Sequence, residues 1–144
     1  MAGYFRKLDG HVYNGAEKAY EELTNGLFVY IDGSNGVKKL GSAGSAEFRV
    51  IEKTTLWGLP AVVLLCTNPG TAEIYMTENE FEDYGDGGDF DLATYSVPAG
   101  HYVKMRRPVI NDEVIVSVTS EVLATLAVGD TVKPTTAGTI VKKT

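Results

Sequence analysis

The residues best suited to chemistry are acidic and lie together near the middle of the chain. Residues 78–91 include seven Asp or Glu residues and no Lys or Arg. Hard divalent cations bind several oxygen ligands from one flexible loop, so Asp86, Asp89 and Asp91 are the candidate calcium ligands. Their spacing departs from the EF-hand pattern. Calcium-binding β-rolls carry tandem copies of their ligand sequence, and this chain has no such repeat. We therefore expect no bound metal, and interpret the stretch as an exposed acidic loop suited to a basic patch on a partner.

The sequence contains no residue set that predicts an enzyme. A glycosidase needs two carboxyl groups in different environments across a cleft, which a loop of like charges does not provide. His11 and His101 are far apart in the sequence, and Cys66 ends the most apolar run, where a thiolate is disfavoured. The glycine pairs in 33–36 and 41–44 lack the Lys-Ser/Thr ending of a phosphate-binding loop. We expect a protein without catalytic activity or cofactor.

Composition and charge narrow the class of protein. The chain has 144 residues, of which 44% are hydrophobic and 22% charged, as in an ordinary globular domain. Its single cysteine cannot form an intrachain disulfide, and its formal charge of -6 disfavours binding to nucleic acid. The N-terminal residues do not resemble a signal peptide. The longest apolar stretch, residues 59–66, is too short to span a bilayer, so no membrane partner is expected.

Most of the chain after Gly26 has the pattern of short strands separated by turns. Residues 46–51 and 72–77 alternate in polarity, and 61–66 form a continuous apolar run typical of a strand buried on both faces. Turn residues predict three hairpins. Their strands are residues 61–66 with 72–77, 102–106 with 113–119, and 126–132 with 139–143. The pattern predicts a mainly β protein, a compact β-barrel or β-sandwich.

The N-terminal region has a different pattern. Ala16, Ala19, Tyr20 and Leu23 recur at helical spacing, which predicts one short amphipathic helix over residues 16–23. Residues 1–15 show no periodicity, and we interpret them as an extended arm that becomes ordered on binding. The expected organisation is therefore an arm, 1–15, followed by a single β-rich domain, 16–144.

Aromatic residues are concentrated outside the expected strands. Tyr is the most frequent, with eight copies, and its flat apolar ring with a polar tip suits contacts between chains. Several aromatic residues lie in the arm or in the acidic stretch, where no strand of the chain is expected to cover them. They are Tyr4, Phe5, Tyr13, Phe81, Tyr84 and Phe90. This distribution predicts a role in contacts with another macromolecule.

Three segments near the C-terminus resemble small structural proteins of tailed bacteriophages. The segments are Tyr95-Ser-Val-Pro-Ala-Gly-His-Tyr-Val103, Arg107-Pro-Val-Ile-Asn-Asp-Glu-Val-Ile-Val116 and Leu126-Ala-Val-Gly-Asp-Thr-Val132. They are most similar in style to the head decoration, or cement, proteins, and the resemblance covers about a third of the chain. It implies a virion structural protein on the capsid surface, made in the host cytoplasm, which binds the major capsid protein and stabilises the head.

A protein of this kind needs contact residues rather than an active site. The expected contacts with the capsid are Tyr4, Phe5, Arg6 and Lys7 in the arm, together with Arg106 and Arg107. Other copies of the chain are possible partners on the lattice, and residues 86–91 are a secondary contact. Two alternatives stay open: a carbohydrate- or ligand-binding β-module, in which Trp57 and exposed Tyr residues stack on a sugar, and a head–tail connector or tail-completion protein.

Overall fold

The fold is seen in a computed structural model, which describes residues 3–7, 12–33, 35–39, 46–70, 74–78, 96–135 and 137–143. Side chains are described for the same residues except 5–7 and 12–16. A six-stranded sheet, in spatial order, contains β1 (Gly3–Lys7), β11 (Glu113–Ser117), β7 (Leu59–Asn68), β6 (Glu47–Leu56), β12 (Thr131–Pro134) and β13 (Ile140–Lys142). A five-stranded sheet contains β2 (Val12–Lys18), β10 (Tyr102–Arg107), β8 (Tyr75–Thr77), β4 (Phe28–Asp32) and β5 (Gly36–Lys39).

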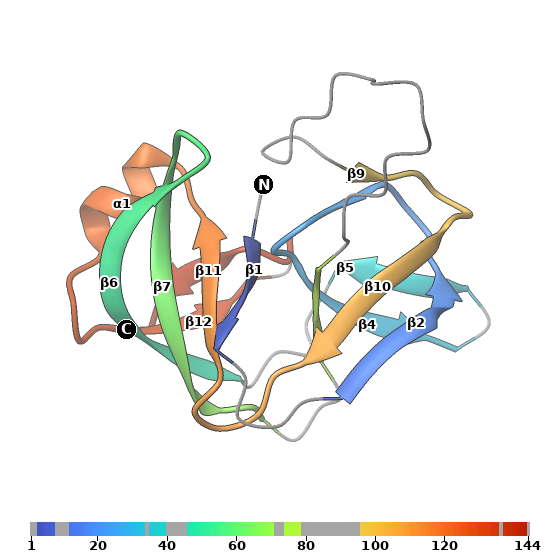
Figure 1. The fold of residues 1–144 in the computed structure, drawn as a ribbon, viewed down its shortest axis with the longest axis horizontal. Coiled ribbons are helices and arrows are strands. Elements are labelled where there is room, and N and C mark those ends of the chain that lie inside the picture. The colour runs from blue at the N-terminus through green and yellow to red at the C-terminus, as the bar shows by residue number, and fades with distance from the viewer. Residues whose placement is uncertain are drawn as a thin grey trace.

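All strand pairs in these sheets are antiparallel, as are β3 (Leu23–Thr24) and β9 (Ser96–Val97), which form a separate two-stranded sheet. Figure 1 shows the six-stranded sheet on the left and the five-stranded sheet on the right. The prediction of a mainly β protein is confirmed. None of the described sheets closes on itself, although a parallel bridge between Ala19 and Val37 joins the end of β2 to β5.

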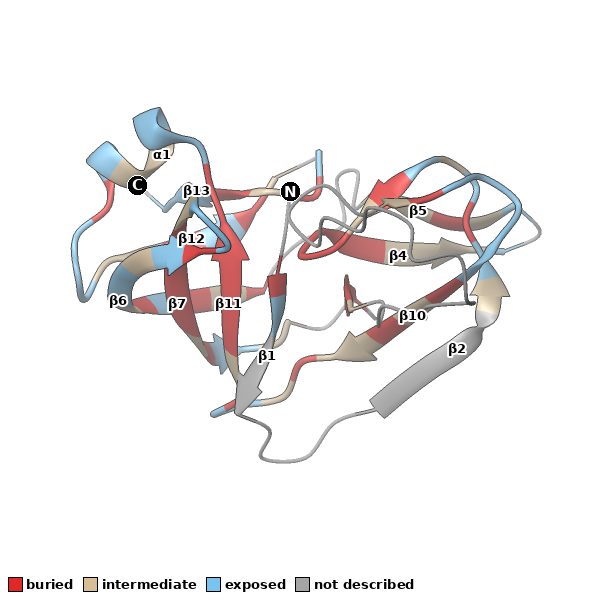
Figure 2. Cartoon of the chain, turned by 45° about the horizontal axis from the view of Figure 1, so that its top comes forward, coloured by how far each residue is buried: buried red, intermediate tan, exposed pale blue. Residues whose placement is uncertain are grey.

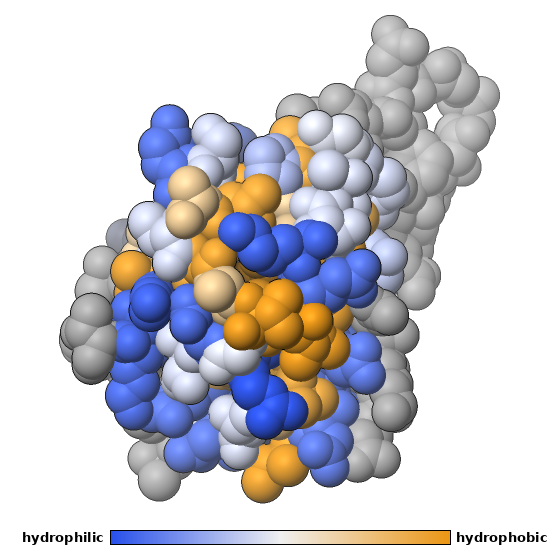
Figure 3. All heavy atoms as spheres, turned by 90° about the vertical axis from the view of Figure 1, so that its left-hand side faces the viewer, coloured by the Kyte–Doolittle hydropathy of each residue, from blue (hydrophilic) through white to orange (hydrophobic). Residues whose placement is uncertain are grey.

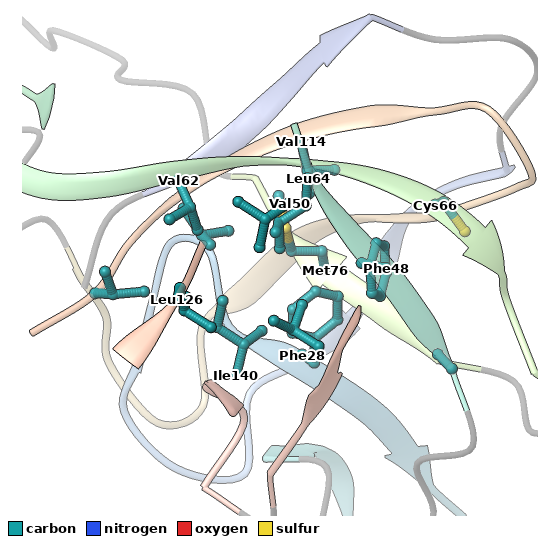
Figure 4. Packing of buried hydrophobic residues seen from close by; sticks show 14 of the residues in the cluster. Phe28, Phe48, Val50, Val62, Leu64, Cys66, Met76, Val114, Leu126 and Ile140 are labelled. Atoms are coloured by element: carbon teal, nitrogen blue, oxygen red, sulfur yellow. The ribbon is translucent and has the colours of Figure 1, made fainter. Parts of the chain in front are cut away.

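The main hydrophobic core lies between the six-stranded sheet and strands β4 and β8. Phe28 of β4 and Phe48 of β6 are both fully buried, with ring centroids 5.1 Å apart. Figure 4 shows the side chains of Val50, Leu64 and Met76 directed toward one another in the same cluster. A backbone hydrogen bond also joins the two sheets, since the Phe28 N–H donates to the Gly138 carbonyl at 2.8 Å.

Strand β7 is buried on both faces, as its apolar sequence predicts. Val62 and Leu64 face the main core, whereas Ala61 and Val63 belong to a second cluster on the opposite face of the sheet. The burial colours of Figure 2 show the same feature along β7 and its neighbour β11. The central strands β7 and β11 therefore carry buried apolar side chains on both faces of the sheet.

The helix predicted over residues 16–23 is wrong. Residues up to Lys18 belong to β2, Ala19 forms a bridge with Val37, and β3 begins at Leu23. The helix of the described region is α1 (Ser120–Thr125), between two predicted strands, where the sequence pattern predicts no helix. Thr119 caps it by accepting a hydrogen bond from the Val122 N–H at 3.2 Å, and Glu121 lies in its first turn.

Two of the three predicted hairpins are also wrong. The turn at Asn68-Pro-Gly70 is present, but β7 pairs with β6 and β11, whereas β8 belongs to the other sheet. In the same way, β10 and β11 lie in different sheets, so residues 108–112 cross from one sheet to the other. The third hairpin is confirmed as β12 and β13, although its first strand begins at Thr131 instead of 126. Buried apolar surface on both sheets selects these partners over the adjacent strands.

The N-terminal residues 3–7 are extended but are not a free arm. They form β1, the edge strand of the six-stranded sheet, with Tyr4 in register opposite Ile115 of β11. A Cβ on Gly3 would lie 2.7 Å from Cα of Gly26, so the backbone of β1 packs closely against a neighbouring turn. Strand β2, which pairs with β10, runs across the boundary predicted between residues 15 and 16.

Candidate interaction surfaces

The first candidate surface is an exposed pair of aromatic rings on the six-stranded sheet. The rings of Tyr4 in β1 and Trp57 in the β6–β7 turn have centroids 5.9 Å apart, with planes inclined at 36°. They remain 36% and 45% exposed, respectively. We call these two residues the aromatic pair. Tyr and Trp are the residues that most often contribute strongly to protein interfaces.

A buried apolar cluster lies on the face of the sheet that carries Tyr4. Because Tyr4 is directly opposite Ile115, their side chains lie on the same face of the sheet. Ile115 packs with Leu56, Ala61 and Val63, and all four are almost fully buried. On the molecular surface, Figure 3 shows hydrophobic residues gathered among hydrophilic ones on the left-hand side of the molecule in Figure 1. Tyr4 thus shares its sheet face with this buried cluster, and Trp57 follows Leu56, a member of the cluster, in the sequence.

The backbone at Trp57 is in an unusual conformation. Trp57 has φ of 50° and Gly58 has φ of 82°, and together they join the register pair Leu56 and Leu59. Positive φ at both positions is typical of a type I′ turn, where Asn-Gly is the favoured sequence. A bulky side chain in this region costs about 1–3 kcal/mol. Placing Trp57 in this turn therefore lowers local stability. Residues with strained backbone often occur at binding sites.

Three of the capsid contacts predicted from the sequence, Tyr4, Arg106 and Arg107, have described side chains. Tyr4 belongs to the aromatic pair, whereas the side chains of Phe5, Arg6 and Lys7 lie outside the described part. The Arg106 Nε donates a hydrogen bond to Glu78 Oε1 at 2.7 Å, so this guanidinium is engaged within the chain. Arg107 is partly exposed at the end of β10. Of the predicted basic contacts with described side chains, Arg106 and Arg107 lie in β10 of the five-stranded sheet, whereas Tyr4 lies in β1 of the six-stranded sheet.

A second surface lies where β2 ends between β10 and β5. Lys18 Nζ is 5.4 Å from the ring centroid of Tyr102, and Lys38 Nζ is 4.3 Å from that of Tyr20. Tyr20 and Tyr102 are 53% and 62% exposed. We call these four residues the aromatic–cationic row. The row could not be found from the sequence, because the helical spacing of residues 16–23 predicts a helix there and cation–π contacts between strands leave no local pattern.

The described nucleophilic and titratable side chains do not form a catalytic set. Cys66 is fully buried, and burial raises the pKa of its thiol to about 12, with the Asp112 carboxylate adding to the effect. His101 is exposed at the start of β10. An open pocket of about 420 Å³ is lined by Glu22, Thr24, Leu27, Lys39, Ala137 and Thr139. Among its described lining residues, Glu22 and Lys39 are the ionisable ones, and none is Ser, Cys or His.

The described residues hold neither a cluster of metal ligands nor a membrane-spanning helix. Asp86, Asp89 and Asp91, the candidate calcium ligands, lie outside the described residues. Elsewhere, the described His, Cys, Asp and Glu residues do not gather in a group of three that could hold an ion. Among the described segments, no helix combines the length and apolar character needed to cross a membrane.

Comparisons with known proteins found no relative of this chain. The chain matches no protein-family model, and no curated protein or solved structure is significantly similar to it. Its function must therefore be argued from its own residues and surfaces.

Proposed function

We propose that this chain is a bacteriophage head decoration protein, which binds the outer surface of the major capsid protein lattice through the aromatic pair. The resemblance of the C-terminal segments to phage structural proteins supports the class of protein. The exposed rings of Tyr4 and Trp57, held above an apolar sheet face, are the observation that carries the proposal. In this assignment the protein is not an enzyme and needs no cofactor.

The aromatic pair has the properties expected of the centre of a protein interface. Its two rings offer a large apolar area, and each has a polar group that can reach a partner. Tyr4 lies in the edge strand β1 and Trp57 in a two-residue turn, so neither has to unfold or change strand pairing to meet a flat surface. Interfaces need such preorganised anchors because each side chain that becomes ordered on binding reduces affinity.

The remainder of the fold suits a structural role. We interpret the two main sheets and their shared core as a β-sandwich that serves as a stiff body. A protein that binds the assembled lattice, but not separated subunits, stabilises the lattice by mass action. Many copies on one head would each contribute a modest amount. Localisation on the capsid surface, after synthesis in the host cytoplasm, follows from the same proposal.

Binding to undecorated heads tests the proposal. The chain is mixed at micromolar concentration with heads assembled without it, and the bound fraction is measured by sedimentation. We expect saturable binding, which Trp57→Ala weakens by at least about tenfold because a central interface Trp contributes more than about 1.4 kcal/mol. Ile110→Ala is the matched control, since Ile110 is 55% exposed but lies in the β10–β11 connection. Absence of binding by the unmodified chain would overturn the proposal.

The aromatic pair also favours a second candidate, a carbohydrate-binding β-module. Two inclined and exposed rings can stack on the apolar face of a sugar ring, with neighbouring polar groups binding its hydroxyls. A glycan array separates the two functions. Selective binding to one glycan, lost in Trp57→Ala, together with no binding to heads would support the module over the decoration protein.

A further inference from the structure

The aromatic–cationic row is continuous across the junction of three strands. The Ala19 N–H donates to the His101 carbonyl, and the Tyr20 N–H donates to the Val37 carbonyl, each at 2.9 Å. These bonds hold residues 18–20 between the start of β10 and β5. Buried Ala19, Val37 and Val103 point into the core beneath, while their neighbours Lys18, Lys38 and Tyr102 point outward. Backbone hydrogen bonds to two neighbouring segments therefore hold the residues that carry the row.

The chemistry of the row suits carboxylates. Two ammonium groups and two phenol hydroxyls supply hydrogen-bond donors, and the rings supply apolar area beside them. Among the described residues, no carboxylate lies within ion-pair distance of Lys18, whereas Lys38 Nζ already holds Asp32 Oδ2 at 2.6 Å. That pair lowers the pKa of Asp32 and raises the pKa of Lys38. The Lys18 ammonium group is thus available to an acidic partner. The ion pair of Lys38 with Asp32 shows that a carboxylate can bind at the row.

The same chain carries a segment of complementary chemistry. Residues 80–91 contain six acidic residues, no basic residue and three aromatic residues. They hold six of the nineteen acidic residues of the chain, and the other thirteen are matched by thirteen Lys and Arg. The net charge of -6 therefore has its source in this segment. Opposite charges on two parts of one protein favour association of its copies.

We propose that the aromatic–cationic row binds residues 80–91 of a second copy of this chain. Such a contact is heterologous, because the two copies use different surfaces, and it joins copies head to tail into a ring or an open array. Its strength depends on charge, so it weakens as salt screens the carboxylates and ammonium groups. The inference is independent of the proposed binding to heads, since it concerns the chain alone.

A labelled synthetic peptide of residues 80–91 tests the contact directly, with binding to the full chain followed by fluorescence anisotropy. We expect saturable binding at 50 mM salt that weakens by at least about tenfold at 300 mM, because salt screens the ion pairs that Lys18 and Lys38 make with the peptide. A control peptide with Asn and Gln in place of the six acidic residues should not bind. Equal binding of the two peptides would overturn the proposal.

Substitutions in the row test whether the peptide binds there. The double substitution Lys18→Gln with Lys38→Gln should weaken peptide binding at least about tenfold, which corresponds to the loss of two charge-assisted hydrogen bonds. Asp32→Asn should strengthen it, because Lys38 loses its present carboxylate partner. Lys133→Gln is the matched control, an exposed lysine on β12 of the other sheet. Circular dichroism confirms that each variant is folded; unchanged affinity in the folded double variant would contradict the assignment.

Self-association of the unmodified chain completes the test. Sedimentation velocity at 5–500 µM and 50 mM salt should show a rising average sedimentation coefficient, which excess peptide suppresses. A chain that binds the peptide yet remains monomeric over this range would overturn the proposal of a contact between copies. Because heads are absent from these experiments, their outcome does not depend on whether the chain decorates a capsid.

Discussion

The ring of Trp57 lies 5.9 Å from the ring of Tyr4, which joins the tip of the longest hairpin to the first strand of the chain. Each of the two residues lies in a backbone position that is unfavourable by itself. Trp57 adopts a positive φ, and Tyr4 lies in an edge strand. The contact between them compensates in part for the strained turn and leaves Trp57 45% exposed, where a partner can reach it.

Replacing Trp57 with Asn should leave the stability almost unchanged. Asn-Gly is favoured in a type I′ turn, so the substitution relieves about 1–2 kcal/mol of backbone strain. It also removes an aromatic contact of about 0.5–1.5 kcal/mol. The free energy of unfolding, measured by urea denaturation, should therefore change by less than about 1 kcal/mol, while binding to heads is lost.

Phe48→Ala provides the comparison for this stability measurement. Phe48 is fully buried against Phe28, and its truncation should cost about 3–5 kcal/mol. A loss for Trp57→Asn as large as that of Phe48→Ala would show that Trp57 is a core residue instead of a surface anchor.

Gly36→Ala should destabilise the junction that supports the aromatic–cationic row. A Cβ at this position, where φ is 113°, would lie 2.4 Å from the Lys18 carbonyl oxygen, so backbone has to move. Gly129→Ala introduces the same kind of strain at φ of 98°, but with no atom within 4 Å. We expect the Gly36 variant to be less stable than the Gly129 variant by about 2 kcal/mol or more in thermal denaturation. Similar melting temperatures would mean that residues 18–20 do not pack against β5.

Cys66 should make the protein less stable at alkaline pH. Burial raises the pKa of its thiol from 9.0 to about 12, so between these values the folded chain keeps a proton that the unfolded chain releases. Stability from this group is complete below pH 9 and falls as the pH rises toward 12. The difference in unfolding free energy between the unmodified chain and Cys66→Ala should thus shrink from pH 8 to pH 11. A difference that stays constant over this range would contradict the raised pKa.

The strands could be predicted from the sequence more reliably than their partners. Alternation in residues 46–51 and the apolar run in 61–66 give correct strands, because local polarity reflects which face of a strand is buried. Partner choice depends on contacts that are distant in the sequence. The turn at Asn68-Pro-Gly70 therefore predicts a hairpin, although β8 is held in the other sheet by β4 and β10.

The helix predicted over residues 16–23 failed for a related reason. Apolar residues at helical spacing also fit a strand that ends in a bridge, and Ala19 and Leu23 are buried in both cases. For the interaction surfaces, the sequence indicates the types of residue involved but not which of them lie together. Tyr4 was singled out as a contact residue, but its position beside Trp57 depends on β1 pairing with β11. Tyr20 and Tyr102 were missed, because cation–π contacts across strands leave no local pattern.

The most direct test of the central claim is a reconstruction of heads to which the purified chain has been added. We predict density for the chain on the outer surface of the lattice, with the β6–β7 turn and β1 facing the major capsid protein and Trp57 within contact distance of it. Heads that carry no such density, or that carry the chain with Trp57 facing solvent, would contradict the account.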